Sequence, residues 1–189
     1  YMESCRKIKY MFPKAHAAAY VIAALRLGWY KIYKPLEYYT AFLTVRGGDL
    51  DASTVIKGRD AVRQKMKEID QKVREKTASA KDKDQYTALQ VVNEMMARNI
   101  ELLPVDIYKS KAKDYIIEDG KIRMPFGALS GVGDSAAIPL AAAREDGGGE
   151  FVSIEDFATR AKAGKSTIEL LKECGAFGDL PESSQLTLF

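Results

Sequence analysis

The pattern of apolar and polar positions predicts a mainly helical N-terminal half. Apolar residues recur at helical spacing in four segments, which we expect to form helices over residues 14–33, 36–45, 60–76 and 87–98. Pro13 and Pro35 flank the first segment and would mark its ends. We expect the second helix to stop at Gly47-Gly48, and the charged run 81–84 to separate the third helix from the fourth.

The pattern changes near residue 104. Val105, Ile107 and Tyr108 predict a short extended piece. Two β-leaning runs then flank the turn residues 118–120, which predicts a small hairpin. The chain therefore divides into a helical part (1–103), connecting strands and a hairpin (104–124), a second helical unit (125–181) and a tail (182–189).

The second helical unit is predicted to contain three short helices, over residues 134–145, 153–161 and 166–174. Ser153 and Ser166 are residues favoured at helix N-caps, and Ser166 with Glu169 has the spacing of a capping box. Pro139 falls inside the first of these helices, where it removes a backbone hydrogen-bond donor. It would kink this helix unless the helix starts late.

Composition and charge narrow the class of protein. The chain has 189 residues, 47% apolar and 29% charged, as expected of an ordinary globular protein of one or two domains. Its net charge of +3 divides into +6 over residues 1–46, +2 over 47–124 and −5 beyond. The basic N-terminal segment favours contact with a polyanion, whereas the acidic C-terminal part would have to bind nucleic acid through backbone groups. The alternative is that this mild charge asymmetry reflects only solvated faces.

The apolar runs and the cysteines of the sequence indicate the cellular location and the kinds of cross-link to expect. The longest uncharged run, 15–25, is shorter than the roughly 20 residues of a membrane span. No signal segment opens the chain, so we expect a cytoplasmic protein without a membrane partner. Cys5 and Cys174 lie at opposite ends, which disfavours a disulfide framework or a cysteine metal site.

One segment has the composition of a phosphate-binding turn. Gly131, Val132 and Gly133 precede an alanine-rich helix, and glycines there let backbone amides approach a phosphate oxygen closely. The following helix directs its positive end at the same anion. Such contacts would bind DNA without regard to base sequence. The alternative is that this turn is only a tight connector.

Two further segments are candidate binding sites. The C-terminal residues Gln185, Leu186, Leu188 and Phe189 form an apolar tail that we expect to insert into a pocket on a partner, the alternative being that it packs on its own domain.

Phe12, Lys14 and His16 stand at the start of the first long helix, a possible site for a triphosphate or a backbone phosphate. The alternative for His16 is an ordinary core histidine. We find no catalytic constellation and no metal site, because nothing near Asp49 and Asp51 would complete a two-metal centre.

Taken in order, these segments resemble the bacterial family C DNA polymerases, most closely the PolC type of Gram-positive replicative polymerase III alpha subunits. The similarity is carried by residues 3–20, by Pro35-Leu36-Glu37-Tyr38-Tyr39, by the Gly-Val-Gly turn, by Cys174-Gly175-Ala176-Phe177 and by the terminal Gln-Leu-Thr-Leu-Phe. These motifs follow one another as in that family and cover essentially the whole chain.

The resemblance implies a role for each part. Residues 1–103 are similar to the end of the polymerase fingers, with Phe12, Lys14 and His16 near the incoming nucleotide. Residues 125–181 resemble a tandem helix-hairpin-helix domain that grips duplex DNA, and residues 185–189 resemble the peptide that docks on the β sliding clamp. In that family the catalytic aspartates and their Mg²⁺ belong to a palm domain upstream of Tyr1. We therefore expect no catalytic residue and no cofactor in this chain.

The leading hypothesis is thus a C-terminal part of a nucleoid-associated DNA polymerase that works with its remaining domains, duplex DNA, an incoming dNTP and the clamp. The absence of an initiator Met before Tyr1 favours it. The alternatives are a free-standing DNA-binding, clamp-docking adaptor and a helical protein–protein module in which the Gly-Val-Gly turn is structural.

Overall fold

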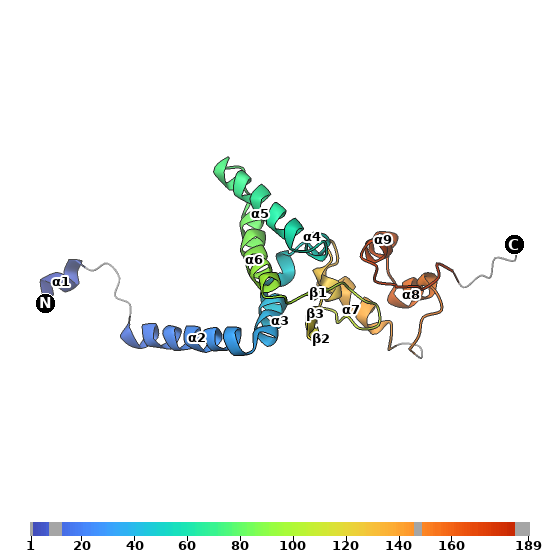
Figure 1. Ribbon diagram of the computed structural model, residues 1–189, viewed down its shortest axis with the longest axis horizontal. Helices are drawn as coiled ribbons and strands as arrows, with labels where there is room; N and C mark the ends of the chain where they lie inside the picture. The colour runs from blue at the N-terminus through green and yellow to red at the C-terminus, as the bar shows by residue number, and fades with distance from the viewer. Residues whose placement is uncertain (1, 8–12, 146–148, 184–189) are drawn as a thin grey trace.

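A computed structural model of the chain describes residues 2–7, 13–145 and 149–183 (Figure 1). These residues are mainly helical with one small sheet, which confirms the predicted fold class. The N-terminal part contains the helices α1 (Met2–Lys7), α2 (Lys14–Tyr33), α3 (Pro35–Arg46), the 3-10 turn η1 (Gly47–Asp49), α4 (Ala52–Ile56), α5 (Arg59–Arg74) and α6 (Ala80–Ala97).

Helix α2 has the predicted bounds, and Pro35 then starts α3 directly after Lys34. Helices α5 and α6 pair as a helical hairpin that projects from the body of the molecule (Figure 1). The short helix α4 was not predicted from the sequence. Its N-cap is Asp51, whose side chain accepts a hydrogen bond from the Ser53 amide at 3.1 Å.

The predicted start of α6 is wrong by about two turns. The charged run 81–84 does not separate two helices but forms the first turns of α6, which starts at Ala80. A capping box explains this start. The Asp82 amide donates to Ser79 Oγ at 3.1 Å, and the Ser79 amide donates to Asp82 Oδ2 at 2.8 Å.

The sheet has three strands in the order β1-β3-β2, from β1 (Leu102–Leu103), β2 (Ile116–Glu118) and β3 (Lys121–Arg123). Strands β2 and β3 form the predicted hairpin, and the turn residues Asp119 and Gly120 adopt positive φ angles of 50° and 78°. Strand β1 pairs with β3 in parallel. The extended piece predicted at residues 105–108 is wrong, since the strand lies earlier and residues 107–109 form a turn.

The C-terminal part contains the 3-10 turn η2 (Phe126–Ala128) and the helices α7 (Asp134–Ala142), α8 (Ile154–Ala161) and α9 (Lys165–Glu173). Helix α7 ends three residues before its predicted end and continues through Pro139. Ser153 is the N-cap of α8, as predicted. The cap predicted at Ser166 is wrong, because Gly164 is the N-cap of α9 and Ser166 lies within the helix.

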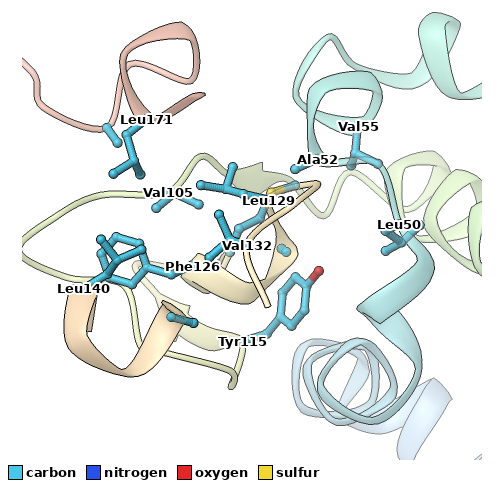
Figure 2. Close-up of a cluster of buried hydrophobic side chains, with 14 of the residues drawn as sticks. Leu50, Ala52, Val55, Val105, Tyr115, Phe126, Leu129, Val132, Leu140 and Leu171 are labelled. Carbon is cyan, nitrogen blue, oxygen red and sulfur yellow. The ribbon is translucent and has the colours of Figure 1, made fainter. Parts of the chain in front are cut away.

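One continuous cluster of buried apolar side chains joins the two parts. Figure 2 shows its centre, where Phe126, Leu129 and Val132 lie between Tyr115 on one side and Val105 with Leu171 on the other. The division into parts at residues 103, 124 and 181 therefore remains a prediction about function, and the core crosses those positions.

A row of aromatic rings extends this core toward the C-terminus. The ring centroids of Tyr108 and Phe151 lie 5.4 Å apart, those of Phe151 and Phe157 lie 5.0 Å apart, and those of Phe157 and Phe177 lie 5.4 Å apart. The last two pairs meet edge to face, which is the geometry favoured by the ring quadrupoles. We call these four residues the aromatic ladder.

Helix α2 stands outside the core. Among the described residues none of its side chains is buried, and the helix extends away from the rest of the molecule (Figure 1). Nine of its large apolar side chains are more than half exposed: Tyr20, Val21, Ile22, Leu25, Leu27, Trp29, Tyr30, Ile32 and Tyr33. A helix that is apolar on all sides is typical of one that is covered by other protein.

Candidate nucleic-acid interface

The Gly131-Val132-Gly133 segment forms the loop of a hairpin between η2 and α7, which we call the first hairpin. The φ angle of Gly131 is +90°, a conformation that side-chain-bearing residues rarely adopt. The buried side chain of Val132 anchors the loop, and the Val132 amide donates to the Leu129 carbonyl at 3.0 Å. Gly133, at φ −73°, is the N-cap of α7. Both glycines are exposed, so the loop backbone faces solvent.

The first hairpin presents a set of unpaired backbone donors. The first bonds of α7 run from the amides of Ala136 and Ala137 to the Gly133 carbonyl, each at 3.0 Å. No side chain caps this helix, and no described residue accepts a hydrogen bond from the amides of Gly133, Asp134 or Ser135. Uncapped amides at a helix N-terminus bind anions through direct hydrogen bonds and the helix dipole.

A second hairpin, between α8 and α9, repeats this arrangement. Lys162 takes the positive φ angle, +51°, and Gly164 is the N-cap with φ −72° and ψ 160°. The amides of Thr167 and Ile168 donate to the Gly164 carbonyl at 3.1 Å, as Ala136 and Ala137 donate to Gly133. Here too the N-cap makes no side-chain bond, and the first helical amides have no acceptor among the described residues.

Sequence analysis did not assign binding residues to this second hairpin. Its positive-φ position holds lysine instead of glycine, so the Gly-x-Gly signal is missing. The available signal was the Ala-Gly that separates two short helical patterns at residues 163–164. Aligning Gly164 with Gly133 would have assigned binding residues to the second hairpin.

The two hairpins differ in charge. Lys162 and Lys165 of the second hairpin are exposed, and neither forms an ion pair with any described residue. The first hairpin instead carries Asp134 at the first position of α7, where the Lys113 ammonium lies 2.6 Å from its carboxylate. The second hairpin therefore presents its own cations to an anion, whereas the first presents a neutralised ion pair.

A cavity of about 320 Å³ lies beside the first hairpin. One wall is the hairpin loop itself, and the other walls come from the N-terminal part of the chain, where η1 contacts both α6 and η2. Its lining residues outside the hairpin are Gly48, Leu50, Asp51, Lys81 and Gln85, with residues 127–130 leading into the loop. The first hairpin thus opens onto a polar recess, not onto a flat surface.

The loop between β1 and β2 supports the first hairpin. The amide of Phe126, in η2, donates to the Lys111 carbonyl at 3.0 Å. The fully buried Ser110 hydroxyl donates to the Met124 carbonyl at 2.7 Å, and the Arg144 guanidinium donates to the Ser110 carbonyl at 2.7 Å. This loop therefore fixes both the entrance of the hairpin and the end of α7.

An ionic cluster holds the sheet to the same loop. The Arg123 guanidinium donates to both carboxylate oxygens of Glu118, at 2.7 and 2.8 Å, and to the Pro104 carbonyl at 2.9 Å. Hydrogen bonds from Arg123 and then Lys109 lower the pKa of Glu118 to about 2. These charges compensate one another and are part of the scaffold, not of the binding surface.

The predicted nucleotide-binding residues lie elsewhere. Lys14 and His16 occupy the first turn of α2 and are exposed, with the His16 ring 4.5 Å from the Tyr20 ring, edge to face. The N-terminal end of α2, where these residues lie, is far from both hairpins (Figure 1). Phe12 lies outside the described residues. The structure therefore brings together Gly131, Val132 and Gly133 but leaves Lys14 and His16 as a separate candidate.

The tail residues Gln185, Leu186, Leu188 and Phe189 also lie outside the described residues. The chain just before them is attached to α8, since the Ile154 amide donates to the Pro181 carbonyl at 2.9 Å. Over the part of the chain that the structure describes, no cluster of three acidic, histidine or cysteine residues could hold a metal ion, and no helix is long and apolar enough to cross a bilayer.

Two helical hairpins on one core, each with an uncapped helix N-terminus after its loop, are typical of a helix-hairpin-helix motif in this part of the chain. A family model described as "Helix-hairpin-helix motif" matches residues 99–186, which span both hairpins. The class predicted from the sequence is thus confirmed.

The full chain matches proteins named "DNA polymerase III PolC-type". It is 44% identical to that of Listeria innocua, 43% to that of Thermotoga maritima and 45% to that of Clostridium perfringens, each over the whole chain. The chain is therefore homologous to a segment of PolC-type DNA polymerase III, which confirms the predicted resemblance. It spans only 13–14% of the length of these relatives.

Proposed function

We propose that the chain is a part of a PolC-type replicative DNA polymerase that holds duplex DNA through its two hairpins. The observation that carries this proposal is the repeated hairpin geometry. Each loop ends at a glycine in the N-cap position, and no side chain caps the helix that follows. We assign the chemistry of polymerisation to other parts of such a polymerase, because this chain spans only 13–14% of the length of the relatives.

The geometry supports contact with phosphates and not with bases. Backbone amides at a helix N-terminus match the oxygen atoms of a phosphodiester, and they carry no information about base sequence. A replicative enzyme must hold every sequence equally, so this mode of binding suits the proposed role. The cations of the second hairpin, Lys162 and Lys165, add the charge that releases counterions from DNA.

The exposed apolar surface of α2 supports the proposal that this chain is part of a longer polymerase. Nine large apolar side chains in water are unfavourable by about 25 cal/mol for each Å² of apolar surface. We propose that the remaining polymerase domains cover this helix. Phe12, Lys14 and His16 would then lie at the edge of that contact and would contact the incoming nucleotide, for which the exposed cation of Lys14 is suited.

We also propose that the tail residues Gln185–Phe189 dock on a β sliding clamp. Their composition supports it, because two or three apolar anchors with a polar rim are the common form of a peptide that fills a groove. Attachment to a polymerase already bound to DNA raises the effective concentration of the tail near the clamp, so that a weak peptide is sufficient.

Duplex binding is tested by Gly133→Ala and Gly164→Ala, measured by fluorescence anisotropy with a labelled blunt duplex. A Cβ at either position meets no atom within 4 Å, and neither glycine has a positive φ angle, so the fold should tolerate both changes. The methyl group would hold the phosphate away from the amides. Loss of one charge-assisted hydrogen bond predicts about tenfold weaker binding for each variant.

Gly28→Ala is the matched control, because Gly28 is also unhindered and lies in α2, away from both hairpins. It should bind duplex like the parent. If both hairpin variants also bind like the parent, the proposed mode of duplex binding is wrong.

Clamp docking is tested by deleting residues 185–189 and titrating the chain with a β sliding clamp in a calorimeter. The deletion should abolish binding to the clamp while duplex affinity is unchanged, because the hairpins are not altered. Unchanged clamp affinity would refute the assignment of the tail.

A further inference from the structure

The cavity beside the first hairpin has a second wall on α6. Lys81 and Gln85 are four residues apart and lie on one face of that helix, and both line the cavity together with Gly131, Val132 and Gly133. Lys81 is exposed, and neither side chain has a hydrogen bond or an ion pair with any described residue. Lys81 and Gln85 thus line a recess of about 320 Å³ together with the loop of the first hairpin.

The position of Lys81 is not explained by helix stability. It is the second residue of α6, and a cation in the first turn of a helix is opposed by the positive end of the helix dipole. An anion in the cavity would remove this conflict, because it would interact favourably with both the ammonium group and the α7 N-terminus.

The comparison of the two hairpins indicates what Lys81 supplies. Lys162 and Lys165 stand in the second hairpin at the positions that Gly131 and Asp134 occupy in the first. The first hairpin therefore has no cation of its own in its loop, and Lys113 is occupied by Asp134. Lys81, which comes from another part of the chain, lines the cavity beside this loop and can supply the missing positive charge.

One acidic group also lines the cavity. Asp51 turns its carboxylate toward α4, where Ser53 Oγ and Thr54 Oγ1 donate to it at 2.7 and 2.8 Å. Burial alone would raise the pKa of Asp51, but these hydrogen bonds lower it below its usual range. Its oxygen atoms are therefore satisfied within α4 and do not need Lys81 as a partner.

We propose, resting on the proposed function of the hairpins, that Lys81 and Gln85 form the second half of the phosphate site of the first hairpin. One DNA strand is then held between the helical N-terminal part and the helix-hairpin-helix part, with the ammonium group of Lys81 on one side of the phosphodiester and the loop amides on the other. The Gln85 amide group supplies a further donor to the same phosphate or to its neighbour.

The test uses Lys81→Ala with Lys83→Ala as the matched control. Lys83 has the same charge and is also exposed in the first turns of α6, but it does not line the cavity. Loss of one phosphate contact predicts a salt slope smaller by about 0.9 and duplex binding weaker by about fivefold at 0.15 M salt. Lys83→Ala should change the affinity by less than about twofold, as expected for an unpaired surface charge.

A double-mutant comparison then separates a shared site from general electrostatics. In the Gly133→Ala background, Lys81→Ala should have less than about half of its effect, because both groups contact one phosphate. In the Gly164→Ala background its effect should remain about fivefold, because that hairpin is a separate site.

Equal effects of Lys81→Ala and Lys83→Ala, or an equal effect of Lys81→Ala in the two glycine backgrounds, would overturn this inference. The proposed function would survive that result as long as Gly133→Ala and Gly164→Ala still weaken binding. Parent-like binding by both glycine variants would instead remove the proposed function, and the composite site with it.

Discussion

The exposed lysines beside the two hairpins predict how strongly the affinity for duplex DNA depends on salt concentration. Lys162 and Lys165 are exposed and unpaired among the described residues, and Lys81 faces the first hairpin. If these three cations contact phosphates, the logarithm of the duplex affinity should fall with the logarithm of salt concentration with a slope of about −2.7. Affinity would then drop about 40-fold between 50 and 200 mM salt.

The double variant Lys162→Ala/Lys165→Ala leaves one of the three contacts. The slope should fall to about −0.9, so that the same change of salt weakens binding only about threefold. Alanine keeps the Cβ of lysine, so the strain of the positive φ angle at Lys162 is unchanged and folding should be preserved. Anisotropy titrations of one labelled duplex at four salt concentrations give the slope directly.

Lys172→Ala is the control for this measurement. Lys172 lies in α9 with Lys165, but its ammonium group is 2.6 Å from the Glu182 carboxylate. Its removal should leave the slope close to that of the parent. A double variant with the parent slope, or a control variant that loses as much, would show that the second hairpin does not contact DNA through these lysines.

Other expected outcomes concern the scaffold. Ser110→Ala leaves the buried Met124 carbonyl and the partly buried Asp106 amide without their partner, so it should lower the free energy of unfolding in urea by about 2 kcal/mol. Ser153→Ala should cost about 1 kcal/mol as the loss of an N-cap, whereas Ser166→Ala should be neutral in the same assay, a contrast that fails if Ser166 caps α9. The pKa of Glu118, lowered to about 2 mainly by Arg123, means that its stabilising effect is complete above the ordinary glutamate pKa and is lost as the pH falls toward 2; Glu118→Gln should remove this part of the acid sensitivity in unfolding measured from pH 5 to pH 2.

Much of the helical fold could be predicted from periodicity, and the exceptions have local causes. The bounds of α2 were predicted because prolines stand near both of its ends. The start of α6 was missed because the run 81–84 is charged, and periodicity of apolar residues cannot detect a solvent-exposed first turn. The capping residues Ser79 and Asp82 were the usable signal, since their spacing is that of a capping box.

The candidate site was predicted only in part for a similar reason. The first hairpin has two glycines, which sequence analysis recognises, whereas the second places Lys162 in the left-handed region and keeps only Gly164. The recess shared by Gly131 and Lys81 joins residues far apart in the sequence. Such a juxtaposition depends on how η1 packs between α6 and η2, and no local pattern in the sequence contains that information.

The aromatic ladder has a mechanical consequence. It links Tyr108, in the loop that supports the first hairpin, through Phe157 of α8 to Phe177, just beyond α9 of the second hairpin. Interlocked rings resist sliding, so the packing of the ladder should hold the two hairpin loops at a fixed distance from each other. If the two hairpins bind phosphates as proposed, a fixed distance between their loops would favour a strand whose phosphates have the matching spacing. Substitutions in the ladder would therefore change the relative position of the two hairpin loops without altering any residue of the loops themselves.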